Sequence, residues 1–599
     1  MNIGTSYFLI IELFSIFLFV GGFSFALFTA EVERRGTLNI ITGNLYSFLE
    51  SENLSASNRI EVEAGESRDI TIYLKNPNSI EARFNLWYEA AEGVNVSYDH
   101  TKDMPPSLDG IVLEVDASKT YQIRITNNTN NKETILFGSE AGLSNKNLLF
   151  PEGGKVIDQV IPKINLDSGM IPVIYNGSTW VKASSSNWYD YDIGKWANAV
   201  TVTSSSRNKY QSASSGVEVL MNDIETMWVY IPRYSYTIGS MDGENYYGKQ
   251  GIYLDSAPTV DLPGEIDIKF IEKDEKDTGS AQYKVSEGVS GWRTPDAFTF
   301  GGEELAGIWV GKFETSSNNP SATNGGDNTT ALDPMIKPNV LSWKNIQYSN
   351  VAEVARKASA SGNRYGLSTT MDSHAMKNSE WGVVSYLSQS KYGKLGNRNY
   401  SGANKEIYQN KTEGSKTSST TGCSYGTPDN DNTDYGCHYT YEKYPEGTGA
   451  STTGTIYGIY DTVGGAWEIV MGSYHPNGTY YSGRNITHHS GYTGLLGDGN
   501  TFNGKSWLAD YYYDFYSDSS EMTACNNHPC YSHALSETMG WYGNTSAMID
   551  HTDPWLLRGG RSYDPTLVSD TGIFYYAHNS GGTSNSSMSF RLVLIEKKR

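Results

Sequence analysis

Short runs of alternating polar and apolar residues, separated by turn residues, fill the region from residue 36 to about residue 150. Residues 59–63 alternate, residues 64–66 (Ala-Gly-Glu) carry a turn signal, and residues 69–74 alternate again. A period of two is typical of strands with one buried face, and two such runs around a short turn predict a hairpin. Further strands are expected at 84–90, 94–98, 121–126 and 134–137. The spacing predicts an immunoglobulin-like β-sandwich over residues 36–150.

The length and charge of the chain limit its domain number and its partners. With 599 residues and about 150 residues per domain, several separate cores are expected. Acidic residues outnumber basic ones 67 to 46, for a net charge of -21, which disfavours binding to nucleic-acid phosphates or anionic lipid head groups. No nucleic-acid partner is therefore expected. The 43 Tyr and 61 Gly indicate a loop-rich β protein that can use Tyr in ligand contacts.

Residues 1–30 contain a nearly uncharged apolar run from residue 13 to residue 30. Its length lies between that of a signal-peptide core and that of a short membrane span. Ser24-Phe25-Ala26 offers the small-x-small pattern of a signal-peptidase site, whereas the first basic residues, Arg34 and Arg35, follow the run and would place the chain inside the cell. Both a cleaved signal peptide and a membrane anchor stay open. The low charge and paired cysteines further on favour an extracellular location, secreted or anchored to the cell surface.

Residues 151–216 are expected to be a linker with a small β element. Residues 171–182 contain two apolar runs around Asn176-Gly177, a strong signal for a two-residue hairpin turn. Four aromatic residues follow, and they either form a sugar-stacking surface or cover a small sheet, with the second interpretation favoured: Trp188, Tyr189, Tyr191 and Trp196.

Residues 217–599 combine apolar strands with two amphipathic helices. Strands are expected at 227–233 and 307–315. One helix would carry Ile346, Val351, Val354 and Ala358 near one face, and a second would begin near Asn378 with Trp381, Val384 and Leu387 at helical spacing. The whole chain is thus expected to be multidomain and mainly β, with an α+β domain at its C-terminal end.

The four cysteines occur as two close pairs in the last third of the chain. For an exported protein, this grouping predicts two local disulfides, Cys423 with Cys437 and Cys525 with Cys530. A zinc site formed by Cys525, Cys530, His528 and His533 is the less favoured alternative.

Three motifs near the C-terminus carry a family resemblance. They are Tyr-Gly-Ile-Tyr-Asp-Thr-Val-Gly-Gly-Ala-Trp-Glu at 457–468, Leu-Arg-Gly-Gly-Arg-Ser-Tyr at 557–563 and Ser-Phe-Arg-Leu-Val at 589–593. In this order, residues 217–599 resemble the formylglycine-generating-enzyme (sulfatase-modifying factor) superfamily, which implies a C-type-lectin-like fold. The family's copper-binding cysteine pair lies between the last two motifs, where residues 561–589 contain no cysteine. Because copper(I) requires soft sulfur ligands, no copper is expected. His488-His489 does not supply an iron site either, so the domain is expected not to be an enzyme.

The same resemblance implies a calcium site and a ligand face. The family's calcium loop corresponds to Asp461, Gly464, Ala466 and Glu468, and oxygen ligands on a glycine turn suit calcium. An ordinary turn with Glu468 paired to an arginine is the alternative. The ligand face of related lectin-like receptors lies between the Arg-Gly-Gly and Phe-Arg motifs, which selects six residues: Tyr563, Tyr575, Tyr576, His578, Asn579 and Asn585. Phe574 and one of the two adjacent tyrosines could instead pack the sheet, since alternate strand residues point inward.

The N-terminal part carries a second resemblance. An apolar segment that runs into Phe-Ala-Leu-Phe-Thr-Ala at 25–30, then Gly-Thr-Leu-Asn-Ile at 36–40 and a β-sandwich, resembles camelysin-type exported biofilm-matrix proteins over residues 1–140. This implies export and association with a fibre or matrix. We therefore expect a bacterial cell-surface or secreted, adhesin-like protein that binds a host or neighbouring-cell glycan or protein. A structural matrix protein is the first alternative, and an oxidase of the formylglycine-generating family is the second.

Overall fold

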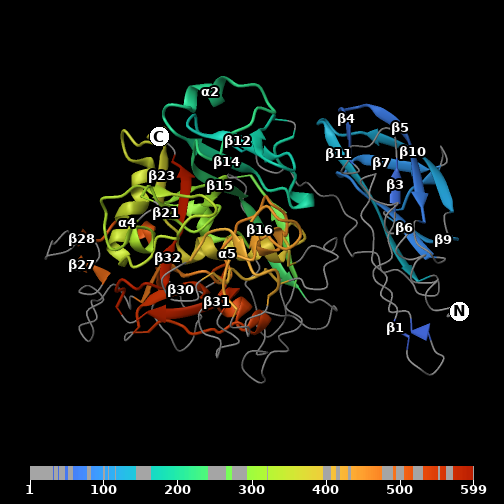
Figure 1. Ribbon diagram of the computed structural model, residues 1–599. Helices are drawn as coiled ribbons and strands as arrows, with labels where there is room; N and C mark the ends of the chain where they lie inside the picture. The colour runs from blue at the N-terminus through green and yellow to red at the C-terminus, as the bar shows by residue number, and fades with distance from the viewer. Residues whose placement is uncertain are drawn as a thin grey trace, which may run out of the picture. The chain divides into compact units, whose positions relative to one another are not determined.

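The computed structural model divides the chain into two units, residues 1–158 and 159–599, each of which is described by itself (Figure 1). It describes residues 31–32, 38–39, 48–50, 59–76, 82–98, 102–105, 107–114, 117–143, 164–185, 187–239, 265–272, 293–319, 322–395, 406–412, 419–428, 434–474, 490–493, 505–516, 531–550, 553–561, 571–579 and 581–597. Within these ranges the fold is mainly β, as predicted, and no helix is long and apolar enough to cross a membrane. The apolar run at 13–30 lies outside them.

The first unit consists of two antiparallel sheets around one core. One sheet has the order β3 (Phe48–Glu50), β5 (Ser67–Lys75), β10 (Ser118–Asn127), β7 (Val94–Tyr98) and β8 (Lys102–Asp103). The other has the order β4 (Arg59–Val62), β11 (Glu133–Leu143), β6 (Ala82–Glu89) and β9 (Ser107–Leu113). A short pair, β1 (Glu31–Val32) and β2 (Leu38–Asn39), precedes them. The strands predicted between residues 59 and 137 are confirmed.

The hairpin predicted across residues 64–66 is wrong. β4 pairs with β11, whereas β5 pairs with β3 and β10, so the chain passes from one sheet to the other at this turn. Alternation fixes which side chains are buried, here Ile70, Ile72 and Leu74 of β5, but it does not fix the partner of a strand.

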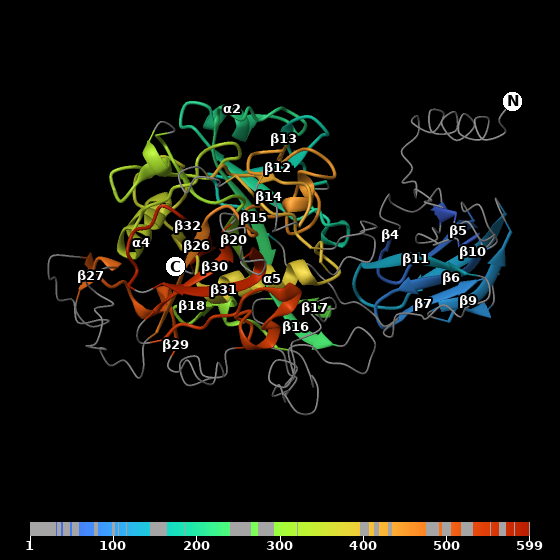
Figure 2. The ribbon, with the colours of Figure 1, turned by 60° about the horizontal axis from the view of Figure 1, so that its bottom comes forward.

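The second unit is built on a seven-stranded antiparallel sheet. Its order is β13 (Trp180–Lys182), β12 (Ile171–Tyr175), β14 (Asn198–Val202), β15 (Ile224–Pro232), β20 (Gly307–Gly311), β33 (Leu592–Glu596) and β23 (Met371–Ala375). Figures 1 and 2 show β12, β14 and β15 side by side. The predicted β12–β13 hairpin at Asn176-Gly177 is confirmed.

The prediction of a separate linker over residues 151–216 is wrong for its described part, which begins at residue 164. β12, β13 and β14 extend the sheet formed by β15, because their runs of apolar residues need a partner sheet to bury them. The four aromatic residues of this segment pack within the unit, with Tyr191 and Trp196 fully buried. The packing interpretation of these side chains is the one that the structure shows.

A second sheet carries the C-terminal motifs. Its order is β29 (Asp514–Tyr516), β26 (Trp467–Tyr474), β30 (Trp555–Gly560) and β31 (Thr571–Asn579), and β32 (Met588–Phe590) pairs with β26. β26, β30 and β31 lie close together in Figure 2. One hydrophobic core extends through both sheets, from Ile164 to Ile595.

The two predicted helices of the second unit are confirmed. α4 spans Tyr348–Arg356 and buries Val351 and Val354, whereas Ile346 precedes it and Ala358 lies in the 3-10 turn that follows. α5 spans Asn378–Gln389 and is buried along its whole length. A third helix is α2 (Arg207–Ser212).

Short strand pairs and 3-10 turns complete the second unit. The pairs are β16 (Tyr234–Gly239) with β17 (Glu265–Phe270), β18 (Thr299–Phe300) with β19 (Glu303–Glu304), β21 (Ser316–Ser317) with β22 (Pro334–Met335), β24 (Cys423–Ser424) with β25 (Tyr439–Thr440), and β27 (Tyr492–Thr493) with β28 (Lys505–Ser506). The turns are η1 (Tyr191–Ile193), η2 (Asp296–Phe298), η3 (Thr323–Gly326), η4 (Lys357–Ser359), η5 (Thr448–Ala450), η7 (Asp510–Tyr512), η8 (Ser536–Thr538) and η9 (Trp541–Gly543).

Candidate functional site

The predicted calcium loop lies inside the core and is engaged by protein groups. Glu468, on β26, is fully buried, and both of its carboxylate oxygens accept hydrogen bonds from the Arg591 guanidinium, with Nε to Oε2 at 2.9 Å. Asp461 accepts hydrogen bonds from Asn410 Nδ2 and from the Gly422 backbone N–H, each at 2.8 Å. Glu468 is thus paired to an arginine, as the alternative interpretation proposed.

A third buried carboxyl, that of Glu314, completes this cluster. Its Oε1 accepts the backbone N–H of Ala466 at 3.1 Å. Burial, together with the negative charges of Asp461 and Glu468, raises the pKa of Glu314 well above its ordinary value. Protein donors already occupy the oxygens of Asp461 and Glu468 that a cation would need, so these residues do not fit calcium in this arrangement. Among the described residues, no group of three or more His, Cys, Asp or Glu side chains could hold a metal ion.

Two tyrosines of the predicted ligand face are buried rather than exposed. Tyr575 is 3% exposed and Tyr576 is fully buried, so the prediction that they offer contact area to a ligand needs correction. The cause is an irregularity in the β30–β31 pairing. Tyr576 lies opposite Arg558, whereas the next pair joins Gly559 to Gly572, so residues 573–575 form a bulge. Strand alternation is lost there, and Ile573 to Tyr576 are all buried.

The remaining described residues of the predicted ligand face do reach the surface. His578 has 39% of its side chain exposed, and its Nδ1 lies 3.5 Å from Asp553 Oδ2. Asn579 Oδ1 accepts the backbone N–H of Gly582 at 2.9 Å. Asn585 is exposed, and its Oδ1 accepts the backbone N–H of Ser587 at 2.8 Å. His578 and Asn579 end β31 and Asn585 lies in the loop to β32, whereas Tyr563 lies outside the described residues.

The two arginines of the C-terminal motifs are structural. Arg558 is fully buried and donates to Asn378 Oδ1 at 2.7 Å and to the carbonyls of His533 and Ala534 at 2.6 and 2.9 Å. Arg591 donates to the carbonyl of Gly311 at 2.8 Å, besides its pairing with Glu468. Each guanidinium therefore joins segments that are far apart in the sequence.

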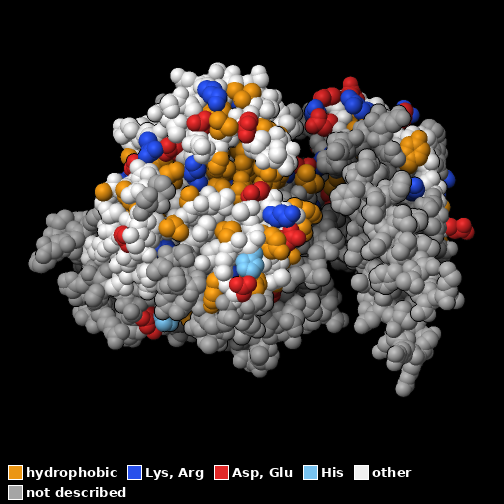
Figure 3. All heavy atoms as spheres, in the orientation of Figure 1, with side chains coloured by type: hydrophobic (Ala, Val, Ile, Leu, Met, Phe, Trp, Pro, Cys, Tyr) orange, Lys and Arg blue, Asp and Glu red, His pale blue; other side chains and the backbone are white. Residues whose placement is uncertain are grey.

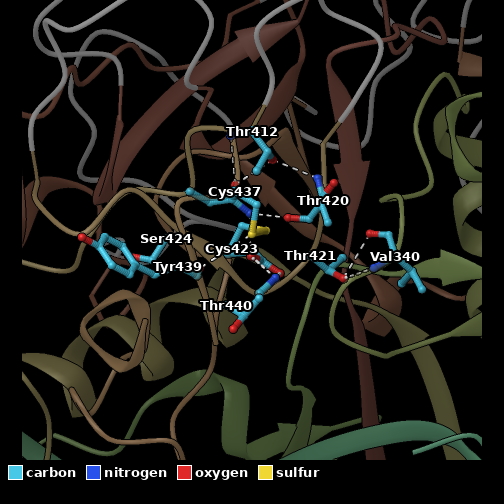
Figure 4. Close-up of a disulfide and its surroundings, with 12 residues drawn as sticks. Val340, Thr412, Thr420, Thr421, Cys423, Ser424, Cys437, Tyr439 and Thr440 are labelled. Carbon is cyan, nitrogen blue, oxygen red and sulfur yellow. Dashed lines mark hydrogen bonds between the residues drawn. A yellow bond between two sulfur atoms is a disulfide. The ribbon is translucent and has the colours of Figure 1, made fainter. Parts of the chain in front are cut away.

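One of the two predicted disulfides is present. Cys423 and Cys437 are bonded, with their Cα atoms 5.1 Å apart, and the bond links β24 to the segment just before β25. Figure 4 shows Thr412, Thr420 and Thr421 around it. The Thr420 backbone N–H donates to Thr412 Oγ1 at 2.8 Å, and Thr421 Oγ1 donates to the Lys337 carbonyl at 2.6 Å. Cys525 and Cys530 lie outside the described residues.

A polar cavity of about 300 Å³ was not predicted from the sequence. It lies where β20 begins and β33 ends, and its lining includes Tyr230, Glu303, Glu304, Trp309, Glu596 and Lys597. These residues are spread over 367 positions of sequence (230 to 597) and share no motif, so only the order of strands in the sheet brings them together. The adjacent Glu303-Glu304 pair was the one local signal.

Charged side chains are scattered over the face of the second unit in Figure 3, and most of the described surface there is uncharged. This agrees with a composition of only 19% charged residues. A surface of this kind offers hydrogen bonds and apolar contacts rather than a strong field of one sign.

The sequence matches no protein-family model, and no curated protein is significantly similar to it. Similar solved structures include the ASH/PapD-like domain of human CEP192 (PapD-like domain 7). The two are 12% identical, and the match covers 20% of this chain and 97% of that domain with a TM-score of 0.11. A likeness this weak assigns neither a fold family nor a function.

Proposed function

We propose that this chain is a bacterial cell-surface or secreted protein of the adhesin type, whose second unit binds a glycan or protein without catalysis. The observation that carries the proposal is the exposed end of β31. There, the imidazole of His578 and the amides of Asn579 and Asn585 stand at the edge of a sheet that is otherwise buried.

The support beneath these side chains is rigid. Residues 571–576 of β31 are buried, and the loop that follows is closed by the bond from the Gly582 N–H to Asn579 and by the bond from the Met588 N–H to the Asn585 carbonyl at 3.1 Å. A fixed backbone that carries adaptable polar side chains lowers the entropy lost on binding, as in antibody loops.

The disulfide supports a location outside the cell. Disulfides persist in oxidising compartments and are rare in the cytosol, and Cys423–Cys437 closes a loop in the second unit. In this proposal, residues 1–30 direct export, either as a signal peptide or as an anchor that makes the membrane a partner.

Finer assignments belong to the same proposal. The order of the motifs at 457–468, 557–563 and 589–593 supports a formylglycine-generating-enzyme-like, C-type-lectin-like fold for the second unit, and the strand spacing supports an immunoglobulin-like type for the first. Structural calcium is not part of this proposal, because Arg591 occupies Glu468.

The test is binding of the full chain to arrays of glycans, mucins and whole cells. One variant changes His578, Asn579 and Asn585 to Ala, and a matched control changes Asn208 and Thr427, which are exposed elsewhere on the same unit. Circular dichroism checks that both variants fold. We expect the site variant to lose at least about tenfold in affinity, the equivalent of 1.4 kcal/mol, and the control to bind like the parent. Equal binding by all three, or no binding by any, would contradict the proposal.

A further inference from the structure

The carboxylates that line the 300 Å³ cavity are only partly neutralised by the protein. Glu304 pairs with Arg233 at 3.3 Å, and the lining cation Lys597 pairs with Asp372 at 2.6 Å. Glu303 has no cationic partner among the described residues, and within the same ranges Glu596 has only the Asn165 amide at 3.5 Å. Two carboxylates therefore face the cavity without a compensating charge.

A tyrosine hydroxyl group accompanies these carboxylates. Tyr230 lines the cavity and is only 4% exposed, and its Oη has no hydrogen-bond partner among the described residues. Gly307, which also lines the cavity, leaves room for it, because a Cβ at that position would lie 2.5 Å from Tyr230 Oη. Burial and the nearby Glu596 raise the pKa of Tyr230, so the phenol stays protonated. The oxygen is therefore free to accept a hydrogen bond from a ligand in the cavity.

The aromatic wall of the cavity narrows the choice of ligand. Trp309 packs against Tyr230 and Trp188, with ring centroids 4.9 and 6.2 Å away, and is only 3% exposed. Because so little of the ring is exposed, it offers no platform on which a sugar ring could stack. The ring still contributes an apolar border suited to a short alkyl chain.

We propose that this cavity binds a primary ammonium group on a short alkyl chain, with Glu303 and Glu596 balancing its charge and Tyr230 Oη accepting one of its N–H bonds. An ammonium group has three donors and no acceptor, which matches the two carboxylates and the phenol oxygen. The site shares no residue with the exposed end of β31, so it is independent of the function proposed above.

The test is titration calorimetry of the full chain with pentylamine, with Nα-acetyl-lysine amide and with pentanol, the neutral analogue of the amine. We expect saturable binding of an amine and none of the alcohol. Binding of pentylamine alone assigns a free amine, and binding of the acetyl-lysine amide assigns the side chain of a peptide lysine. Equal binding of pentanol, or no binding of either amine at millimolar concentration, would overturn the proposal.

Variants locate the binding. The double variant Glu303→Gln with Glu596→Gln changes two exposed side chains, so we expect it to fold. The double variant should bind the amine about tenfold or more weakly, because charge-assisted hydrogen bonds are lost. Tyr230→Phe removes only the acceptor and should weaken binding less. Glu442→Gln, an exposed change outside the cavity, should leave the affinity unchanged. Amine binding that survives the double variant would place the ligand elsewhere and overturn the proposal.

Discussion

At the scale of single residues, the Arg591–Glu468 pair shows how a motif can carry structure rather than chemistry. The Phe-Arg motif places Arg591 where it joins Glu468 of β26 to the carbonyls of Gly311 and Tyr460. All of these groups are buried, so the guanidinium satisfies acceptors that water cannot reach. Removal of one partner from such a pair leaves an uncompensated charge in the core.

We expect Arg591→Met to lower the free energy of unfolding by roughly 3–5 kcal/mol. The matched double variant, Arg591→Met with Glu468→Met, should recover only part of this loss, because it removes the unpaired charge of Glu468 but leaves the buried carboxyls of Asp461 and Glu314 without the arginine. Chemical denaturation measures both. A single variant as stable as the parent would show that the pair is not buried as described.

Glu314 makes stability depend on pH. Its folded pKa is raised above the unfolded value, so the folded state holds a proton that the unfolded state releases. The contribution of this group to stability is present below the unfolded value, about 4.3 for Glu, and declines as the pH rises above it. Glu314→Gln, which mimics the protonated form, should therefore gain stability relative to the parent between pH 5 and pH 8, by at most about 1.4 kcal/mol per pH unit. Thermal unfolding of both proteins at pH 5 and pH 8 checks this. A difference in stability between variant and parent that becomes smaller at pH 8 would refute it.

Local geometry also explains which residues of the candidate site could be predicted from the sequence. His578, Asn579 and Asn585 are polar residues at a strand end and in a loop, and they reach the surface as expected. Tyr575 and Tyr576 do not, because the bulge at 573–575 depends on the partner strand and leaves no trace in a single sequence. The pairing of Glu468 was foreseen only as an alternative, since Arg591 lies 123 residues away.

At the scale of elements, strand positions were predictable and strand partners were not. Alternation located β4, β5, β6, β7, β10 and β11, yet it implied a β4–β5 hairpin in place of a crossing between sheets. The Asn-Gly turn did fix a partner, β13 for β12, because a two-residue turn forces its flanking strands together. By contrast, the addition of β14 to β15 follows from the tertiary core.

The disulfide between β24 and β25 should stabilise the second unit. Its cysteines are 14 positions apart, and closure of a loop of this size contributes about 3 kcal/mol in the chain-entropy account. Replacement of Cys423 and Cys437 by Ser should lower the melting temperature of the second unit. Reducing agent should lower the melting temperature of this unit in the parent but not in the variant. A variant with an unchanged melting temperature would show that the loop is held by its backbone bonds alone.

At the scale of the whole molecule, the residues that the structure describes form two separate cores. One joins the sheets of residues 59–143, and the other extends from Ile164 to Ile595. Each unit buries its own apolar side chains, so each is expected to unfold as its own cooperative transition.

Gly138→Val should separate these transitions. A Cβ at residue 138 would lie 2.1 Å from the Trp87 ring, and overpacking of this kind costs about 1–3 kcal/mol. Differential scanning calorimetry should show the transition of the first unit at a lower temperature and the transition of the second unit unchanged. A shift of both together would mean that the units unfold as one.

The measurement that tests the central claim most directly is photo-crosslinking on intact cells. A benzophenone amino acid replaces Asn585 in one version of the full chain and Glu442, exposed elsewhere on the second unit, in the other. If the exposed end of β31 binds the ligand, irradiation should crosslink the first version to a cell-surface molecule and should leave the second version uncrosslinked. Attachment from Glu442 alone, equal attachment from both, or attachment from neither would contradict the account.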